Sequence, residues 1–124
     1  MRKILLIAIA MVCLAGCSKE KVMQGRYTAS TSIGTINIEL LAGGNCVASL
    51  DGGPESTGFY KIKGDEISIS GCMIDNGKDF FSRNHKCYLF NGNNPGKIYD
   101  KYSFGIDVKN AYGDDKVFCS FVQR

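Results

Sequence analysis

Apolar and polar residues alternate with a period of two along most of the chain. In the segment GFYKIKGDEISISG, Tyr60 and Ile62 alternate with polar residues on one side of a turn, and Ile67 and Ile69 resume the alternation on the other side. Successive side chains of a β-strand point to opposite faces, so this pattern predicts a hairpin with one buried face. Gly64 supplies the left-handed backbone that such a tight turn requires.

The same pattern recurs in segments separated by short stretches rich in glycine and asparagine. NGNNPG at 91–96 and YGDD at 112–115 are turns by composition, and the segment 73–82 is predicted to hold a short turn of helix. The predicted strands span residues 26–30, 34–41, 45–50, 58–63, 66–70, 85–90, 99–108 and 116–122. About eight short strands with brief connections predict an all-β domain, a small antiparallel meander that closes into a barrel or folds into a sandwich.

The first residues break this pattern. Arg2 and Lys3 precede an uninterrupted run of apolar and small residues from Ile4 to Cys17. This run is shorter than the roughly 20 residues with which a helix spans a bilayer. It has the length of the hydrophobic region of a signal peptide, and it is therefore left out of the predicted fold.

The end of the apolar run carries the most specific motif in the chain. Leu14, Ala15, Gly16 and Cys17 resemble the lipobox of bacterial lipoproteins at every position. The resemblance implies that the Cys17 thiol accepts a diacylglyceryl group and that the chain is cut just before this residue. Several acyl chains on one residue anchor a protein firmly without a spanning helix.

This resemblance divides the chain into three parts. It implies a cleaved signal peptide at 1–16, a lipidated N-terminus and tether at 17–25, and a β domain at 26–124. Ser18, which is not aspartate, implies sorting to the outer membrane if the host is Gram-negative. The membrane face, periplasmic or surface, stays open.

A second resemblance concerns the fold of the domain. Its first part contains a GxY start, an apolar strand, a glycine turn and the stretch FYKIKGDEISI. This pattern, which covers Gly25 to Gly71, is similar to the small lipocalin-like or calycin-like barrels found among bacterial lipoproteins. It implies a fold and no particular function.

Four cysteines remain once the leader and the lipid acceptor are set aside: Cys46, Cys72, Cys87 and Cys119. An even number in a small exported domain predicts two disulfides. Three connectivities are open, and for two of them the loop-entropy model gives totals of about 7 kcal/mol, so energy does not choose. We prefer Cys46 with Cys72 and Cys87 with Cys119, because each pair then joins nearby strands within one half of the meander.

Charge excludes one class of partner. The whole chain has 15 basic and 12 acidic residues, a net charge of +3. Without Arg2 and Lys3 the balance is 13 to 12, or +1. No basic stripe is present, so a nucleic-acid partner is not predicted.

Few residue patterns in the sequence indicate catalysis or metal binding. His85 and Cys87 would share one face of a strand, but a Cys–His dyad requires a free thiol, and exported cysteines are usually oxidised. DNGKD at 75–79 carries carboxylates at alternate positions, yet Phe80 and Lys86 stand where a calcium loop requires glycine and glutamate. The cysteine spacings contain no CxxC and the chain has one histidine, which disfavours a zinc site. We expect no catalytic residues, no metal and no cofactor.

Recognition is the remaining possibility. Phe80 and Phe81 are consecutive in a predicted loop and cannot both point inward, so we expect one of them to contact a protein partner. The chain is therefore predicted to be an envelope-anchored lipoprotein that acts as a binding or inhibitory module and not as an enzyme. Alternatives are a receptor-blocking lipoprotein of superinfection or entry exclusion, and a structural accessory of an envelope complex. A further alternative is a lysozyme inhibitor, because STGFYKIKGDE resembles, with a different spacing, the Ser-Gly and Tyr motifs of membrane-bound lysozyme inhibitors.

Overall fold

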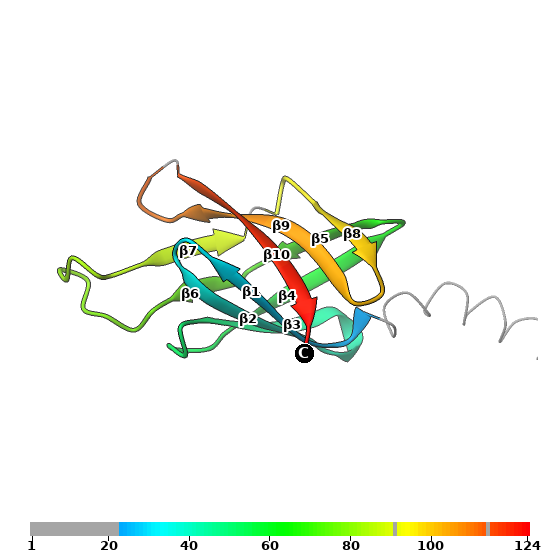
Figure 1. Ribbon diagram of the computed structural model, residues 1–124, viewed down its shortest axis with the longest axis horizontal. Helices are drawn as coiled ribbons and strands as arrows, with labels where there is room; N and C mark the ends of the chain where they lie inside the picture. Colours follow the sequence, from blue (N-terminus) through cyan, green and yellow to red (C-terminus); the bar gives the residue numbers. More distant parts are fainter. Residues whose placement is uncertain (1–22, 91, 114) are drawn as a thin grey trace, which may run out of the picture.

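The computed structural model describes residues 23–90, 92–113 and 115–124, which form ten β-strands and one short 3-10 helix (Figure 1). The strands are β1 (Gly25–Thr31), β2 (Gly34–Leu40), β3 (Asn45–Leu50), β4 (Ser56–Lys63), β5 (Glu66–Ser70), β6 (Met73–Asp75), β7 (Cys87–Phe90), β8 (Gly96–Asp100), β9 (Ser103–Asn110) and β10 (Lys116–Gln123). The 3-10 helix η1 (Ala42–Gly44) joins β2 to β3. The predicted all-β fold is confirmed.

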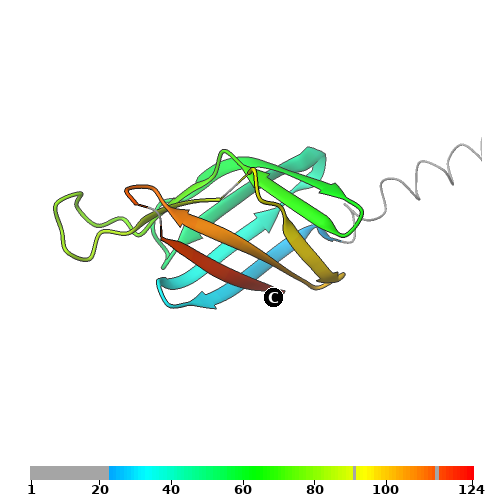
Figure 2. The same ribbon diagram turned by 90° about the horizontal axis from the view of Figure 1, so that it is seen from above.

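The sheet closes on itself. Neighbouring strands are antiparallel in the order β10, β1, β2, β3, β4, β5, β8, β9, and β9 pairs again with β10. These eight strands form the barrel that Figure 2 shows from above. Closure leaves no free edge in the ring, which is how small β proteins avoid edge-to-edge aggregation. Of the two predicted architectures, the barrel is the one observed.

One edge of β9 is divided between two partners. β8 pairs with its first half, where Lys97 lies opposite Gly105, and β7 pairs with its second half, where Phe90 lies opposite Val108. β6 adds to the other edge of β7, with Met73 opposite Leu89. β7 and β6 therefore form a two-stranded ribbon attached to the barrel.

Inward-facing side chains fill the barrel. The Phe104 ring lies 5.1 Å from the Tyr27 ring and 5.0 Å from the Phe121 ring, measured between centroids, and all three side chains are fully buried. The largest fully buried side chains are Tyr27, Phe104, Phe121, Met23, Ile36, Ile38, Leu40, Leu50, Ile67, Ile69, Ile74 and Ile106. These side chains form a packed core inside the barrel.

The single strand predicted at 99–108 is wrong. The chain turns at Lys101 and Tyr102, which separates β8 from β9. The Asp100 carboxylate causes this turn, because it accepts hydrogen bonds from the Tyr102 N–H at 2.7 Å and the Ser103 hydroxyl at 3.0 Å. Such side-chain contacts compete with the strand ladder. Gly96, predicted to end a surface loop, begins β8.

The helical turn predicted at 73–82 and the strand start predicted at residue 85 also need correction. Residues 73–75 are β6, because Ile74 is buried in the core and its strand pairs with β7. The ladder of β7 begins at Cys87, two residues later than predicted. His85 therefore lies in the loop that joins the two strands.

The stacked aromatic core predicts a large effect of truncating Phe121. Phe121→Ala should lower the free energy of unfolding by about 3–5 kcal/mol, since it removes a fully buried ring and leaves a cavity. Val122→Ala is the matched control, because the adjacent side chain is 54% exposed, and its effect should stay within about 0.5 kcal/mol. Urea denaturation followed by circular dichroism measures both. Equal effects of the two changes would contradict the packing described here.

Candidate functional site

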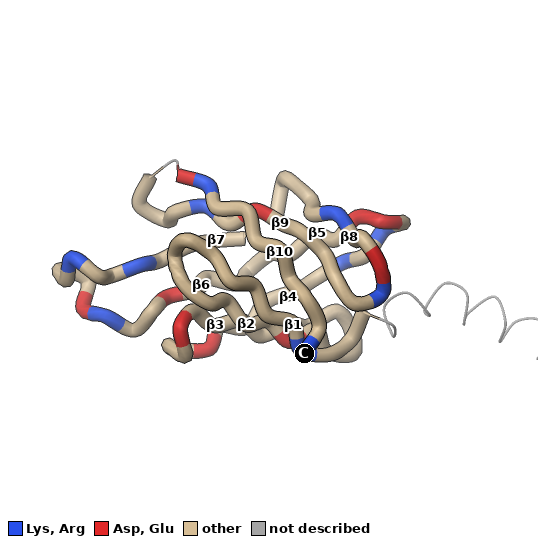
Figure 3. The backbone as a smooth tube through the Cα atoms, in the orientation of Figure 1, with Lys and Arg blue, Asp and Glu red and all other residues tan. Residues whose placement is uncertain are grey.

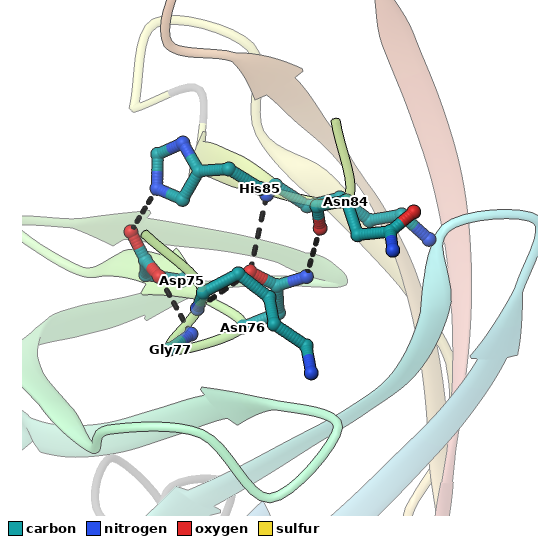
Figure 4. Close-up of polar contacts among 7 residues, drawn as sticks. Asp75, Asn76, Gly77, Asn84 and His85 are labelled. Carbon is teal, nitrogen blue, oxygen red and sulfur yellow. Dashed lines mark hydrogen bonds and ion pairs between the residues drawn. The ribbon is translucent and has the colours of Figure 1, made fainter. Parts of the chain in front are cut away.

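A loop between β6 and β7, residues 76–86, projects beyond one end of the barrel (Figures 1 and 2). Its two ends are joined by backbone and side-chain hydrogen bonds of Asn76. The Asn76 N–H donates to the Lys86 carbonyl, and the Lys86 N–H donates to Asn76 Oδ1, both at 3.1 Å. The Asn76 side-chain amide also donates to the Asn84 carbonyl (Figure 4). The loop therefore begins from a fixed stem.

A carboxylate–imidazole pair lies at the same stem. Asp75 Oδ2 is 2.8 Å from His85 Nε2, and Asp75 Oδ1 accepts the Gly77 N–H at 2.7 Å (Figure 4). The His85 side chain is only 8% exposed. Partial burial by itself raises the pKa of the Asp75 carboxyl, but the hydrogen bonds from Gly77 and His85 outweigh it and leave this pKa below its usual value.

The distal part of the loop is folded as well. The Ser82 N–H donates to the Asp79 carbonyl at 2.9 Å, and the His85 N–H donates to the Ser82 carbonyl at 3.1 Å. The Lys86 ammonium donates to the Ile33 carbonyl at 2.8 Å and so ties the loop to the turn between β1 and β2. These hydrogen bonds connect the distal part of the loop to its stem and to the turn between β1 and β2.

Aromatic rings gather on this fixed loop. The Phe80 ring lies 5.3 Å from the Phe81 ring, 5.3 Å from the Tyr112 ring and 5.6 Å from the His85 ring, measured between centroids. Phe80 is nevertheless 62% exposed, and Phe81 is 94% exposed. The sequence predicted that one of the two phenylalanines is exposed, whereas the structure exposes both. Their contact with a partner stays a prediction.

The loop lies at the end of the barrel opposite the start of β1. β1 runs from Gly25 to Thr31, a rise of about 20 Å at roughly 3.3 Å per residue. The contact of Lys86 with Ile33 places the loop beside the far end of this strand. The chain therefore enters the barrel at one end and presents the aromatic loop at the other (Figure 1).

Sequence reasoning found the two phenylalanines but not the residues that position them. Tyr112 lies in the turn between β9 and β10, far from Phe80 in the sequence, whereas Asp75 ends β6, five residues before Phe80. The available signal was local: Asp75, Asn76 and Gly77 before the phenylalanines are all residue types that favour turns through local hydrogen bonds or backbone freedom. Their pairing with His85 follows only from the β6–β7 register.

One of the two preferred cysteine pairs is brought together. Cys46 Sγ in β3 lies 3.4 Å from Cys72 Sγ, and both side chains are buried. The other pair is not. The Ala111 N–H, just past the end of β9, donates to the Cys87 carbonyl, whereas Cys119 lies opposite Ile106, five residues earlier in the chain and so about 17 Å away along the strand. A disulfide requires Cα atoms within about 7 Å, so this register does not support the pairing of Cys87 with Cys119.

The surroundings of Cys87 disfavour the thiolate that a Cys–His dyad requires. Burial raises the pKa of the Cys87 thiol, against a smaller lowering by its hydrogen bond with Tyr112, and Asp75 raises it further. The Asp75 carboxylate contacts His85 through Nε2.

Other sequence motifs lie elsewhere. Tyr60, in the segment that resembles lysozyme inhibitors, is a buried residue of β4 whose hydroxyl donates to the Leu41 carbonyl at 2.7 Å. Among the described residues, no three His, Cys, Asp or Glu side chains are placed to hold a metal ion. The lipobox residues Leu14 to Cys17 lie outside the described residues. In the described ranges 23–90, 92–113 and 115–124, no helix is long and apolar enough to cross a membrane.

The thiol contact predicts a Cys46–Cys72 disulfide in the oxidised protein. Closing a loop of 26 residues contributes about 3.5 kcal/mol in the loop-entropy model. Cys46→Ala should therefore lower the free energy of unfolding by about this amount without reductant, and by clearly less with reductant, which is the control. Peptide mapping under non-reducing conditions identifies the bonded pair. A peptide that links Cys72 to Cys87 would contradict this assignment.

The Asp75–His85 pair predicts a pH-dependent stem. The folded-state pKa of Asp75 is lowered, so its ionised form stabilises the loop above the ordinary value of 3.8, and this contribution is lost as pH falls below it. Asp75→Asn should reduce hydrogen-exchange protection of the Ser82 and His85 amides by about tenfold near neutral pH. The wild-type protection should approach that of the variant in acid.

Asp79→Asn is the control for this change, because Asp79 is exposed in the same loop and its carboxylate makes none of the stem contacts. Its amide protection should match that of the wild type at every pH. If Asp75→Asn leaves the protection of both amides unchanged, the pair does not hold the loop.

Comparison of the chain with models of protein families, with curated proteins and with solved structures gives no match. A function is therefore inferred from the resemblance of Leu14 to Cys17 to a lipobox and from the geometry of the 76–86 loop.

Proposed function

We propose that the chain is a bacterial lipoprotein anchored through Cys17, and that its barrel is a non-catalytic module that binds an envelope protein through the 76–86 loop. The observation that carries this proposal is the exposure of Phe80 and Phe81 on a loop held by hydrogen bonds. Large apolar side chains in water on a rigid support are typical of binding sites.

Preorganisation supports a binding role. Hydrogen bonds of Asn76, Asp75 and Lys86 join the two ends of the loop and tie it to the barrel. Binding then costs little further loop entropy, which is a main term opposing association.

The direction of the loop indicates where the partner lies. The tether at 17–25 leads into the start of β1, and the loop lies at the far end of that strand. Nine extended residues reach about 30 Å at most. A tether of this reach lets the loop contact a partner on the side of the barrel that faces away from the membrane, on either face of an outer membrane.

The projecting shape favours an inhibitory or receptor-blocking mode among the binding roles. A narrow convex loop fits a concave site on its partner, such as the active-site cleft of an enzyme or the mouth of a receptor. A structural accessory would instead be expected to offer a broad apolar face. The resemblance to lysozyme inhibitors adds no support here, because Tyr60 is buried and its hydroxyl is bonded to Leu41.

Photo-crosslinking in the intact envelope tests this function. A benzophenone amino acid is placed at position 81 of the full chain, and the same residue at position 59 is the matched control, because Phe59 is 63% exposed on the barrel wall. Position 81 should give one discrete protein adduct and position 59 should not. Phe80→Ala in the position-81 background should reduce the yield several-fold, because it removes the ring that supports the probe.

The anchor is tested in the same cells. Cys17→Ser should abolish labelling by a palmitate analogue and move the chain out of the membrane fraction. The absence of an adduct at position 81, or equal adducts at both positions, contradicts the loop as the binding site. Persistent lipid labelling of the Cys17→Ser chain contradicts the anchor.

A further inference from the structure

We infer that the 76–86 loop recognises a protein surface with an apolar pocket rimmed by carboxylates, and that Phe81 is the side chain that enters the pocket. This inference rests on the proposed function and adds the chemistry of the partner. It is carried by the exposure of one ring together with the charges placed around it.

Phe81 is the anchor among the loop aromatics. It is 94% exposed, whereas Phe80 packs edge to face against both Phe81 and Tyr112. Phe80 thus supports the base of the Phe81 ring and leaves its remaining surface in water. Aromatic side chains that anchor an interface are often held by a neighbouring ring on one side and exposed to solvent on the other.

Basic residues flank the two phenylalanines on both sides. Lys78 precedes Phe80 by two residues and Arg83 follows Phe81 by two, and both are exposed. Together with Lys86 they give three cations against one acidic residue of the loop, Asp79, a net charge of +2 for residues 76–86. Figure 3 shows these charges at the projecting end of the molecule.

The complement of this arrangement is acidic. A pocket that accepts Phe81 brings its rim close to Lys78 and Arg83, and carboxylates there give favourable pairing while like charges repel. Lys86 contributes less, because its ammonium is bonded to the Ile33 carbonyl at the stem. Specificity then arises from the rim, and affinity from the buried ring.

An anionic lipid surface offers the same pair of features, apolar depth and negative charge. Two observations favour a protein instead. The loop lies at the end of the barrel opposite the start of β1, into which the proposed anchored segment leads. In addition, the Asp79 carboxylate directly precedes the two exposed phenylalanines, and a carboxylate beside the rings is unfavourable at an anionic lipid surface.

Charge reversal combined with the position-81 crosslinker tests the inference. Lys78→Glu with Arg83→Glu should lower the adduct yield in intact cells by about tenfold. Lys61→Glu with Lys63→Glu is the matched control, because these exposed lysines lie on β4 in the barrel wall, and it should change the yield by less than about twofold. The position-81 adduct is digested and the crosslinked partner peptide is mapped by mass spectrometry.

The mapped peptide gives a stricter test. Reversing the partner's acidic residues next to the crosslink to lysine should restore the adduct with the Lys78→Glu, Arg83→Glu chain. Raising the salt concentration should weaken the wild-type adduct in isolated envelopes, which tests the charge term without any variant. Thermal unfolding of the double variant should match the wild type.

The outcomes distinguish the proposal that the loop binds a partner from the inference that this partner has a pocket with an acidic rim. If the adduct yield depends on Phe80 but changes with neither charge reversal nor salt, the loop still binds a partner, but the acidic rim is overturned. Crosslinking of position 81 to phospholipid assigns the loop to a membrane and overturns the protein pocket. The absence of any adduct at position 81 with native flanking residues overturns both.

Discussion

The double pairing of β10, with β1 on one side and β9 on the other, is the constraint on which the rest of the structure depends. It joins the last strand to the first and closes the ring, and it fixes which side chains face inward. Once β10 occupies one edge of β9, β8 and β7 must share the other edge. The second half of that edge carries the β7–β6 ribbon out of the ring, and the ribbon carries the aromatic loop.

Much of this fold follows from the alternation of apolar and polar residues. Tyr60, Ile62, Ile67 and Ile69 lie where the alternation places them, because one face of the β4–β5 hairpin is in the core. Alternation does not reveal the turn after Asp100, since a hydrogen-bonded side chain causes it and the pattern continues on both sides. It also does not reveal β6, because three residues are too few to establish a period.

The candidate site was predictable only in part. Two consecutive phenylalanines in a polar segment identify exposed rings, since neighbouring side chains of extended backbone diverge. The support for those rings comes from Asp75, His85 and Tyr112, which meet through the pairing of β6 with β7 and of β7 with β9. Contacts of that kind depend on sheet register, which local sequence does not specify. The cysteines show the same limit, because proximity along the meander suggested two pairs and the register brings together one.

The 76–86 loop lies outside the barrel, and this affects how its sequence can evolve. Residues 76–86 contribute no side chain to the hydrophobic core. Substitutions in the distal part of the loop therefore leave the folding free energy of the barrel almost untouched, while they alter the surface offered to a partner. Under the proposed binding role, recognition and stability are encoded in different residues, so selection can change one while the other is conserved, and the barrel can serve as a constant frame for a variable loop.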